Sequence, residues 1–107
     1  MLSIKPGVNA NHLTPAIVLA LIVCERVYAD FGYATVLTSG LEGRHGETSL
    51  HYAGAAIDLR TRHVAQAHLR EMVRAISDAL GRDFDVVLEA THLHVEHQPR
   101  RVDDGVR

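Results

Sequence analysis

Two short segments of the chain concentrate side chains that could bind a metal ion. In the first, six residues separate His51 from Asp58. In the second, Glu89 precedes the pair His92 and His94, which flank a leucine. A catalytic zinc needs about three nitrogen or oxygen ligands and one open position. His51, Asp58 and one histidine of the second segment would supply that set. A carboxylate beside such a site can act as general base, so these residues indicate metal-assisted hydrolysis.

The spacing of the second segment favours one shared face. Residues two apart on a β-strand point to the same side of the sheet, so both His92 and His94 can line one site. A two-residue turn at Ala90 and Thr91 would place Glu89 opposite His92 on that face. A lone His-x-His pattern is weak by itself, because histidines are also common on protein surfaces.

The presence of the carboxylate of Asp58 in an apolar stretch has two explanations. It stands between Ile57 and Leu59, in a stretch typical of a buried strand. A buried carboxylate is costly unless it is paired or bound to a metal. An ion pair with Arg60 or Arg62 would satisfy it without any metal.

Composition restricts the classes of function. Of 107 residues, 47% are hydrophobic and 22% charged, as expected for one globular domain spanning residues 1–107. The formal charge of −2 gives no basic surplus for nucleic acid. Cys24 is the only cysteine, which excludes an internal disulfide and a multi-cysteine zinc site. Because it lies in an apolar run, we expect a buried, inert thiol.

The same apolar run, residues 16–23, is too short to span a bilayer, and no signal-peptide cleavage site follows it. We therefore expect no membrane insertion and a cytoplasmic location after synthesis. The sequence leaves the oligomeric state open, and a monomer is favoured. Action on a cell wall would then require delivery by a phage or a lysis system.

The predicted fold class is α+β, with two helices packed on a small, mainly antiparallel sheet. Thr14 as N-cap and Pro15 at the first helical position predict a helix that ends near residue 31, before Gly32. The first half of this helix is apolar nearly all round, which predicts deep burial. Residues 1–12 are expected to be a loop. The other expected elements are a helix at residues 64–80, ended by Gly81, and strands at 34–38, 55–59, 84–89 and 92–96.

Residues 43–58 resemble the metal motif shared by hedgehog signalling domains and the D-alanyl-D-alanine peptidases of bacteria and phages. Every fixed position of the motif Ser-x-His-x-x-Gly-x-Ala-x-Asp is present between Ser49 and Asp58. Residues 84–94 resemble the closing strand pair of the same family. The resemblance covers residues 34–97, and it implies a hedgehog/D-Ala-D-Ala peptidase-like fold with one bound Zn²⁺.

The resemblance also implies roles for individual residues. The zinc ligands would be His51, Asp58 and His94, with His92 as a catalytic neighbour and Glu89 as the base. Many relatives place the acid three residues before the ligand histidine, whereas here Glu89 stands three residues before His92. His92 therefore stays open as the alternative ligand. The substrate-binding candidates are Ser49, which matches a carboxylate-binding serine, His45, which matches a histidine near the zinc, and Arg44.

The expected function is a zinc-dependent peptidoglycan peptidase, of carboxypeptidase or endopeptidase type, such as a phage endolysin. It would cleave a bond of the wall stem or cross-link peptides through a zinc-activated water. Two alternatives stay open: a non-catalytic, hedgehog-like zinc-binding interaction module, and a structural protein without metal.

Overall fold

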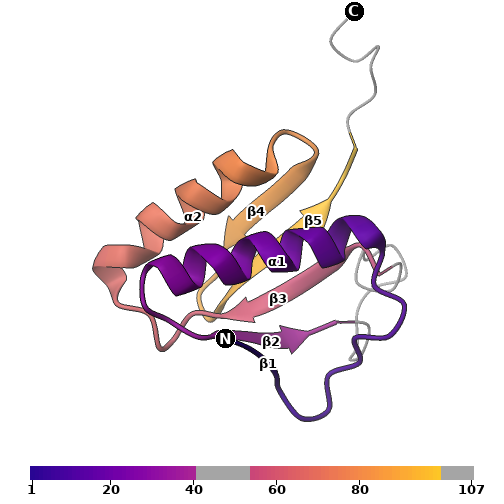
Figure 1. The fold of residues 1–107 in the computed structure, drawn as a ribbon, viewed down its shortest axis with the longest axis horizontal. Helices are drawn as coiled ribbons and strands as arrows, with labels where there is room; N and C mark the ends of the chain where they lie inside the picture. The colour runs from indigo at the N-terminus through magenta and orange to yellow at the C-terminus, as the bar shows by residue number, and fades with distance from the viewer. Residues whose placement is uncertain (41–53, 100–107) are drawn as a thin grey trace, which may run out of the picture.

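The computed structural model describes residues 1–40 and 54–99. Two helices and five strands form in this part of the chain, and Figure 1 shows their arrangement. In chain order they are β1 (Leu2–Ile4), α1 (Pro15–Asp30), β2 (Thr35–Ser39), β3 (Ala56–Arg60), α2 (Gln66–Leu80), β4 (Phe84–Leu88) and β5 (His92–His97).

The five strands form one sheet in the order β1-β2-β3-β5-β4. Only β1 and β2 pair in parallel, and the other three pairings are antiparallel. The α+β class with a mainly antiparallel sheet is therefore confirmed. Strand β1 was expected to be loop, which is wrong. Its three side chains are all exposed, so it carries no alternation of burial from which a strand could be predicted.

Helix α1 starts and ends as its sequence predicts. The Thr14 side chain accepts a hydrogen bond of 3.3 Å from the Ile17 N–H, and Pro15 takes the first helical position. Phe31 closes the C-terminus, and Gly32 follows with φ +87°. None of the described helices is long and apolar enough to cross a membrane.

One face of α1 is buried and the opposite face is exposed. The buried residues follow helical spacing, whereas Val18, Leu19 and Ile22 are 42%, 63% and 59% exposed. The expectation that the first half would be deeply buried is therefore wrong for these three. The physical reason is that the sheet can cover only one face of a helix. The buried set is Ile17, Ala20, Leu21, Cys24, Val27 and Tyr28.

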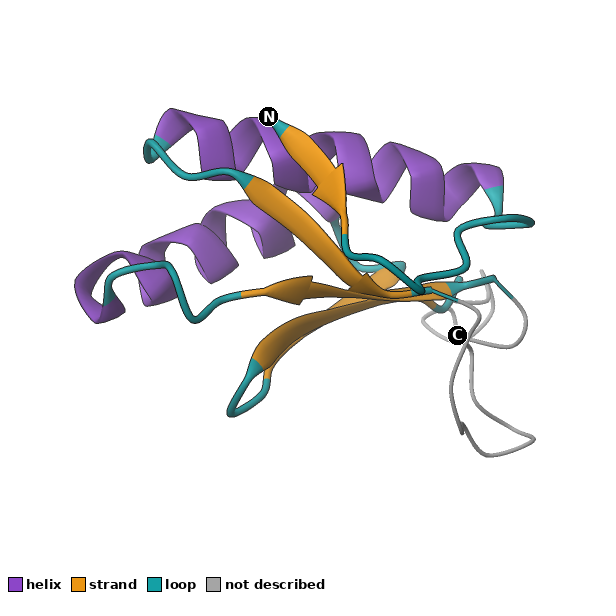
Figure 2. Cartoon of the chain, turned by 90° about the horizontal axis from the view of Figure 1, so that it is seen from below, coloured by secondary structure: helices purple, strands orange, loops and turns teal. Residues whose placement is uncertain are grey.

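Helix α2 begins at Gln66, two residues later than expected, and its N-cap residue, Ala65, makes no side-chain capping hydrogen bond. It ends at Gly81, as predicted, with φ +81°. Both helices lie on the same side of the sheet (Figure 2). The core between them and the sheet contains Ile57, Leu59, Leu93 and Val95 from β3 and β5.

The other side of the sheet, which we call the open face, carries polar side chains. Neighbouring residues on a strand point to opposite faces, so the residues between the core positions of β3 and β5 point away from the helices. These residues are Asp58, Arg60, His92, His94 and Glu96.

Gly54 fixes the start of β3 against the segment before α1. Its carbonyl accepts a hydrogen bond of 3.0 Å from the Thr14 N–H. Its φ is +72°, and a Cβ added there would collide with the backbone carbonyl oxygen of His12. Only glycine satisfies both conditions without strain. The glycine of the motif thus has a structural role close to Asp58.

Candidate functional site

The pairing of β3 with β5 brings Asp58 of the first candidate segment beside the histidines of the second. Asp58 lies opposite His94, and Arg60 lies opposite His92. Directly opposed residues of an antiparallel pair have Cβ atoms about 5 Å apart, which is close enough for side-chain contact. The carboxylate and both imidazoles therefore share the open face.

His94 lies between two carboxylates. Its Nδ1 is 2.8 Å from Asp58 Oδ1, and its Nε2 is 2.8 Å from Glu96 Oε1. The Glu96 carboxylate in turn accepts a hydrogen bond from the Gln98 side chain. His94, Asp58 and Glu96 are only 14–19% exposed, so water screens these contacts weakly.

This environment raises the pKa of His94 to about 9. The hydrogen bond to Asp58 is the largest cause, the contacts with Glu96 act in the same direction, and burial opposes both. In the absence of metal the ring is thus an imidazolium at neutral pH. It donates one hydrogen bond to each carboxylate.

His92 faces Asp58 from the next position along the same face. Its Nε2 lies 3.7 Å from Asp58 Oδ1. Its Nδ1 is 3.0 Å from the Thr91 hydroxyl, which holds the ring with Nε2 toward the site. Both histidines therefore reach the same carboxylate oxygen, and His94 is the closer of the two.

Glu89 lies across the hairpin from His92. The Glu89 N–H donates a hydrogen bond of 2.8 Å to the His92 carbonyl, and Leu88 pairs with Leu93 in the register. The connection is thus the predicted two-residue turn, and Glu89 is opposite His92. Its side chain is exposed.

The donors at this position suit zinc. Two tetrahedral ligands, each about 2.0 Å from a zinc ion, are about 3.3 Å apart. The distances from Asp58 Oδ1 to His94 Nδ1 and to His92 Nε2 are each within about half an ångström of that value. Among residues 1–40 and 54–99, no three His, Cys, Asp or Glu side chains form a complete metal-binding group. Completion of the predicted set depends on His51.

Four of the predicted site residues lie outside the described part of the chain: Arg44, His45, Ser49 and His51. The structure therefore brings together Asp58, His92 and His94, with Glu89 beside them. The arginine ion pair that was the alternative explanation of Asp58 does not form, and Asp58 is paired with His94 instead. Within the described chain, neither Arg60 nor Arg62 makes an ion pair.

Three other described histidines make structural contacts. His63 Nε2 lies 2.7 Å from the Ala34 carbonyl, and His68 Nδ1 lies 2.7 Å from the Tyr33 hydroxyl. His97 packs against the Phe84 ring, with 4.7 Å between centroids. None of these three histidines belongs to the predicted site, and their contacts give each a structural role.

A cavity of about 480 Å³ adjoins the site at its His92 end. Sequence reasoning considered Arg60 only as a partner of Asp58 and missed the cavity. The period of two along β3 could have placed Arg60 on the face of Asp58. The described residues that line the cavity are Lys5, Thr38, Ser39, Asp58, Arg60, Arg62, Ala90, Thr91 and His92.

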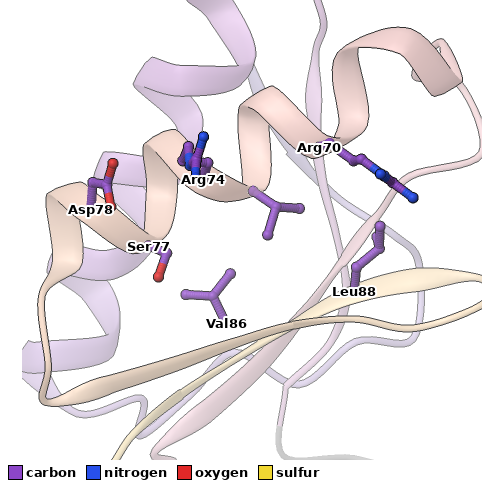
Figure 3. A pocket seen from close by; sticks show the side chains of 7 residues that line it. Arg70, Arg74, Ser77, Asp78, Val86 and Leu88 are labelled. Carbon is purple, nitrogen blue, oxygen red and sulfur yellow. The ribbon is translucent and has the colours of Figure 1, made fainter.

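A second cavity, of about 330 Å³, lies between α2 and β4 (Figure 3). Arg70 and Arg74 flank an apolar floor that includes Val86 and Leu88. These two β4 residues pair with core positions of β5, so they point to the helix side of the sheet. This cavity is therefore separate from the candidate site.

Comparison with protein-family models and with curated proteins found no match to this chain.

Proposed function

We propose that the protein is a zinc-dependent peptidase that hydrolyses a peptide bond in the stem or cross-link peptides of peptidoglycan. The observation that carries the proposal is the position of Asp58 Oδ1, 2.8 Å from His94 Nδ1 and 3.7 Å from His92 Nε2. These donors lie beside a cavity on the open face. The substrate class rests on the resemblance of residues 43–58 to the hedgehog and D-Ala-D-Ala peptidase motif.

Asp58 and His94 would hold the zinc together with His51. Zn²⁺ held there would supply Lewis-acid polarisation of the scissile carbonyl and make an attacking water more acidic. The contact of His94 Nε2 with Glu96 favours the tautomer that keeps its proton on Nε2. That tautomer leaves the Nδ1 lone pair directed at the metal position, and such an outer carboxylate is common behind metal-binding histidines.

The remaining chemistry is proton transfer and charge stabilisation. The attacking water loses a proton to Glu89 as its oxygen bonds to the carbonyl carbon. Glu89 then delivers that proton to the amine nitrogen as the C–N bond breaks, which gives one carboxylate and one amine. His92 Nε2 points toward Asp58 and the same region. From there it can donate a hydrogen bond to the developing oxyanion.

The test is digestion of purified peptidoglycan, with fragments identified by mass. Wild type should release peptide fragments, and a chelator should stop the release. Glu89→Gln keeps the shape of the side chain and removes the proton acceptor, so its rate should fall by about 10²-fold or more. Zinc content measured on the same samples should not change.

The same experiment separates the enzyme from a zinc-binding interaction module. If wild type binds one zinc per chain but releases nothing from any wall preparation, the catalytic proposal is wrong. If Glu89→Gln cleaves at the wild-type rate, another residue is the base, and Glu96, whose Oε1 lies 2.8 Å from His94 Nε2, becomes the next candidate.

A further inference from the structure

We propose that the cavity beside His92 is a binding site for a carboxylate of the ligand, held by Arg60, Arg62 and Lys5. That the ligand is a peptidase substrate rests on the proposed function. The binding of an anion there rests only on the charges and positions described below.

The charge of the cavity opposes that of the chain. Lys5, Arg60 and Arg62 line it, and Asp58 is the only acidic residue of its described lining. The whole chain has a formal charge of −2. Within the described residues, none of the three cations has an ion-pair partner. Three cations around one cavity repel each other, and a bound anion would relieve that repulsion.

Arg60 is well placed to join this cavity to the reacting centre. It lies opposite His92 in the register of β3 and β5, two residues after Asp58 on the open face. Its carbonyl accepts a hydrogen bond of 2.9 Å from the hydroxyl of the buried Tyr28, which fixes the end of the strand. A guanidinium on a fixed strand can bind a carboxylate through two parallel hydrogen bonds.

The rest of the lining suits a small polar group. The hydroxyls of Thr38, Ser39 and Thr91 add neutral hydrogen-bonding groups around the cations. The volume of about 480 Å³ lies in the range of small-molecule sites. The cavity is therefore large enough for the end of a peptide and carries donors for its carboxylate.

Two kinds of carboxylate share this chemistry: the free C-terminus of a peptide, and an acidic side chain within one. The test uses three synthetic wall peptides of otherwise equal sequence. The first has a free C-terminus and an acidic side chain, the second has its C-terminus amidated, and the third has its side-chain carboxylate amidated. Loss of affinity for the second or for the third identifies which carboxylate is bound.

The variants are Arg60→Gln, Arg62→Gln and the double change. Hydrogen bonds to charged groups correspond to about a 10- to 100-fold change in affinity. The double variant should therefore raise the KM and the Kd of the first peptide by at least about tenfold. The KM and Kd of the peptide that lacks the bound carboxylate should change by less than about twofold. Arg60→Lys should recover part of the loss because it restores the charge.

The matched control is Arg70→Gln with Arg74→Gln, which removes the same charge from the cavity of Figure 3. It should leave the KM and Kd of all three peptides unchanged. If it weakens binding as much as the double variant does, the effect is one of net charge, and the proposed site is wrong.

Binding and hydrolysis are measured separately so that the two proposals can fail separately. Calorimetric Kd values for the three peptides are obtained with Glu89→Gln, which needs no turnover. If the first peptide binds more tightly than an amidated peptide, and this difference in Kd disappears in the double variant, the anion site is supported. This holds even if wild type hydrolyses nothing. Equal affinity for all three peptides overturns the site, even if wild type is an active peptidase. Arg62 is exposed, so Arg62→Gln alone keeps the test valid if a change at Arg60 impairs folding.

Discussion

Asp58 and His94 are cross-strand partners, and their side chains meet at 2.8 Å although they lie 36 positions apart in the chain. The contact joins the two segments that carry the candidate chemistry. A register slip of one residue between β3 and β5 would turn one of the two side chains into the core. The apolar neighbours Ile57, Leu59, Leu93 and Val95, each at most 2% exposed, therefore fix the site as well as the fold.

The first prediction separates the two histidines of β5. His94 is closer to Asp58 than His92 is, so we expect His94→Ala to lose the zinc, whereas His92→Ala should keep it and lose activity. Zinc per chain is measured by elemental analysis, with Asp58→Ala and His51→Ala as positive controls for metal loss. The opposite pattern would show that the ligand is the histidine three residues after Glu89.

The second prediction concerns the pH dependence of zinc affinity. The hydrogen bond to Asp58 is the main cause that raises the pKa of His94 to about 9 in the metal-free protein. Below this pKa a zinc ion must displace a proton from the ring, so zinc binding strengthens as the pH rises. The apparent Kd for zinc should therefore fall about tenfold between pH 7 and pH 8, with about one proton released per zinc bound.

Calorimetry in buffers of different ionisation enthalpy measures both the apparent Kd for zinc and the number of protons released. A histidine with its ordinary pKa of about 6.5 would already be mostly neutral at pH 7 and would give a much smaller change. In Glu96→Gln one of the two carboxylates at His94 is lost, so the pH dependence should weaken. An apparent Kd that does not change between pH 7 and pH 8 would contradict the prediction.

The fold was predictable wherever local chemistry determines it. The Thr14 cap, Pro15 and the two glycines after the helices mark helix ends through backbone geometry alone, and the structure agrees within two residues at each end. Strand β1 was missed because it depends on a partner distant in the chain. Its backbone pairs with β2, as when the Thr35 N–H donates to the Met1 carbonyl at 2.8 Å, while its side chains remain exposed.

The candidate site was predictable only in part, for a similar reason. The period of two along β5 places His92 and His94 on one face, and this holds. The contact of Glu96 with His94 and the cations beside His92 depend on side-chain conformation and on the pairing of distant strands. The period of two puts Glu96 on the face of His94, but it does not determine that contact or bring the cations of other segments beside His92.

The third prediction concerns the thiol of Cys24. The side chain is fully buried in the core beneath α1, and burial raises its pKa to about 12. The thiolate is the reactive form, so native protein should resist alkylation at pH 8 for hours, whereas unfolded protein should react at once. Mass spectrometry after timed alkylation, with and without denaturant, measures the difference. Rapid labelling of native protein would mean that α1 opens readily.

The last prediction concerns Gly54, the fixed glycine of the motif. Its φ of +72° disfavours any side chain, and a Cβ there would also collide with the His12 carbonyl. Gly32 provides a matched control, because its φ is +87° but a Cβ would meet nothing within 4 Å. The left-handed conformation alone costs an alanine about 1–2 kcal/mol, which is the expected loss for Gly32→Ala. Gly54→Ala adds the collision and should lower the free energy of unfolding by about 3 kcal/mol or more.

Urea denaturation with a chelator present measures the two losses of stability without a contribution from bound metal. Equal losses would show that the segment around His12 moves aside, and that Gly54 is needed only for its positive φ and not for its close approach to the segment before α1.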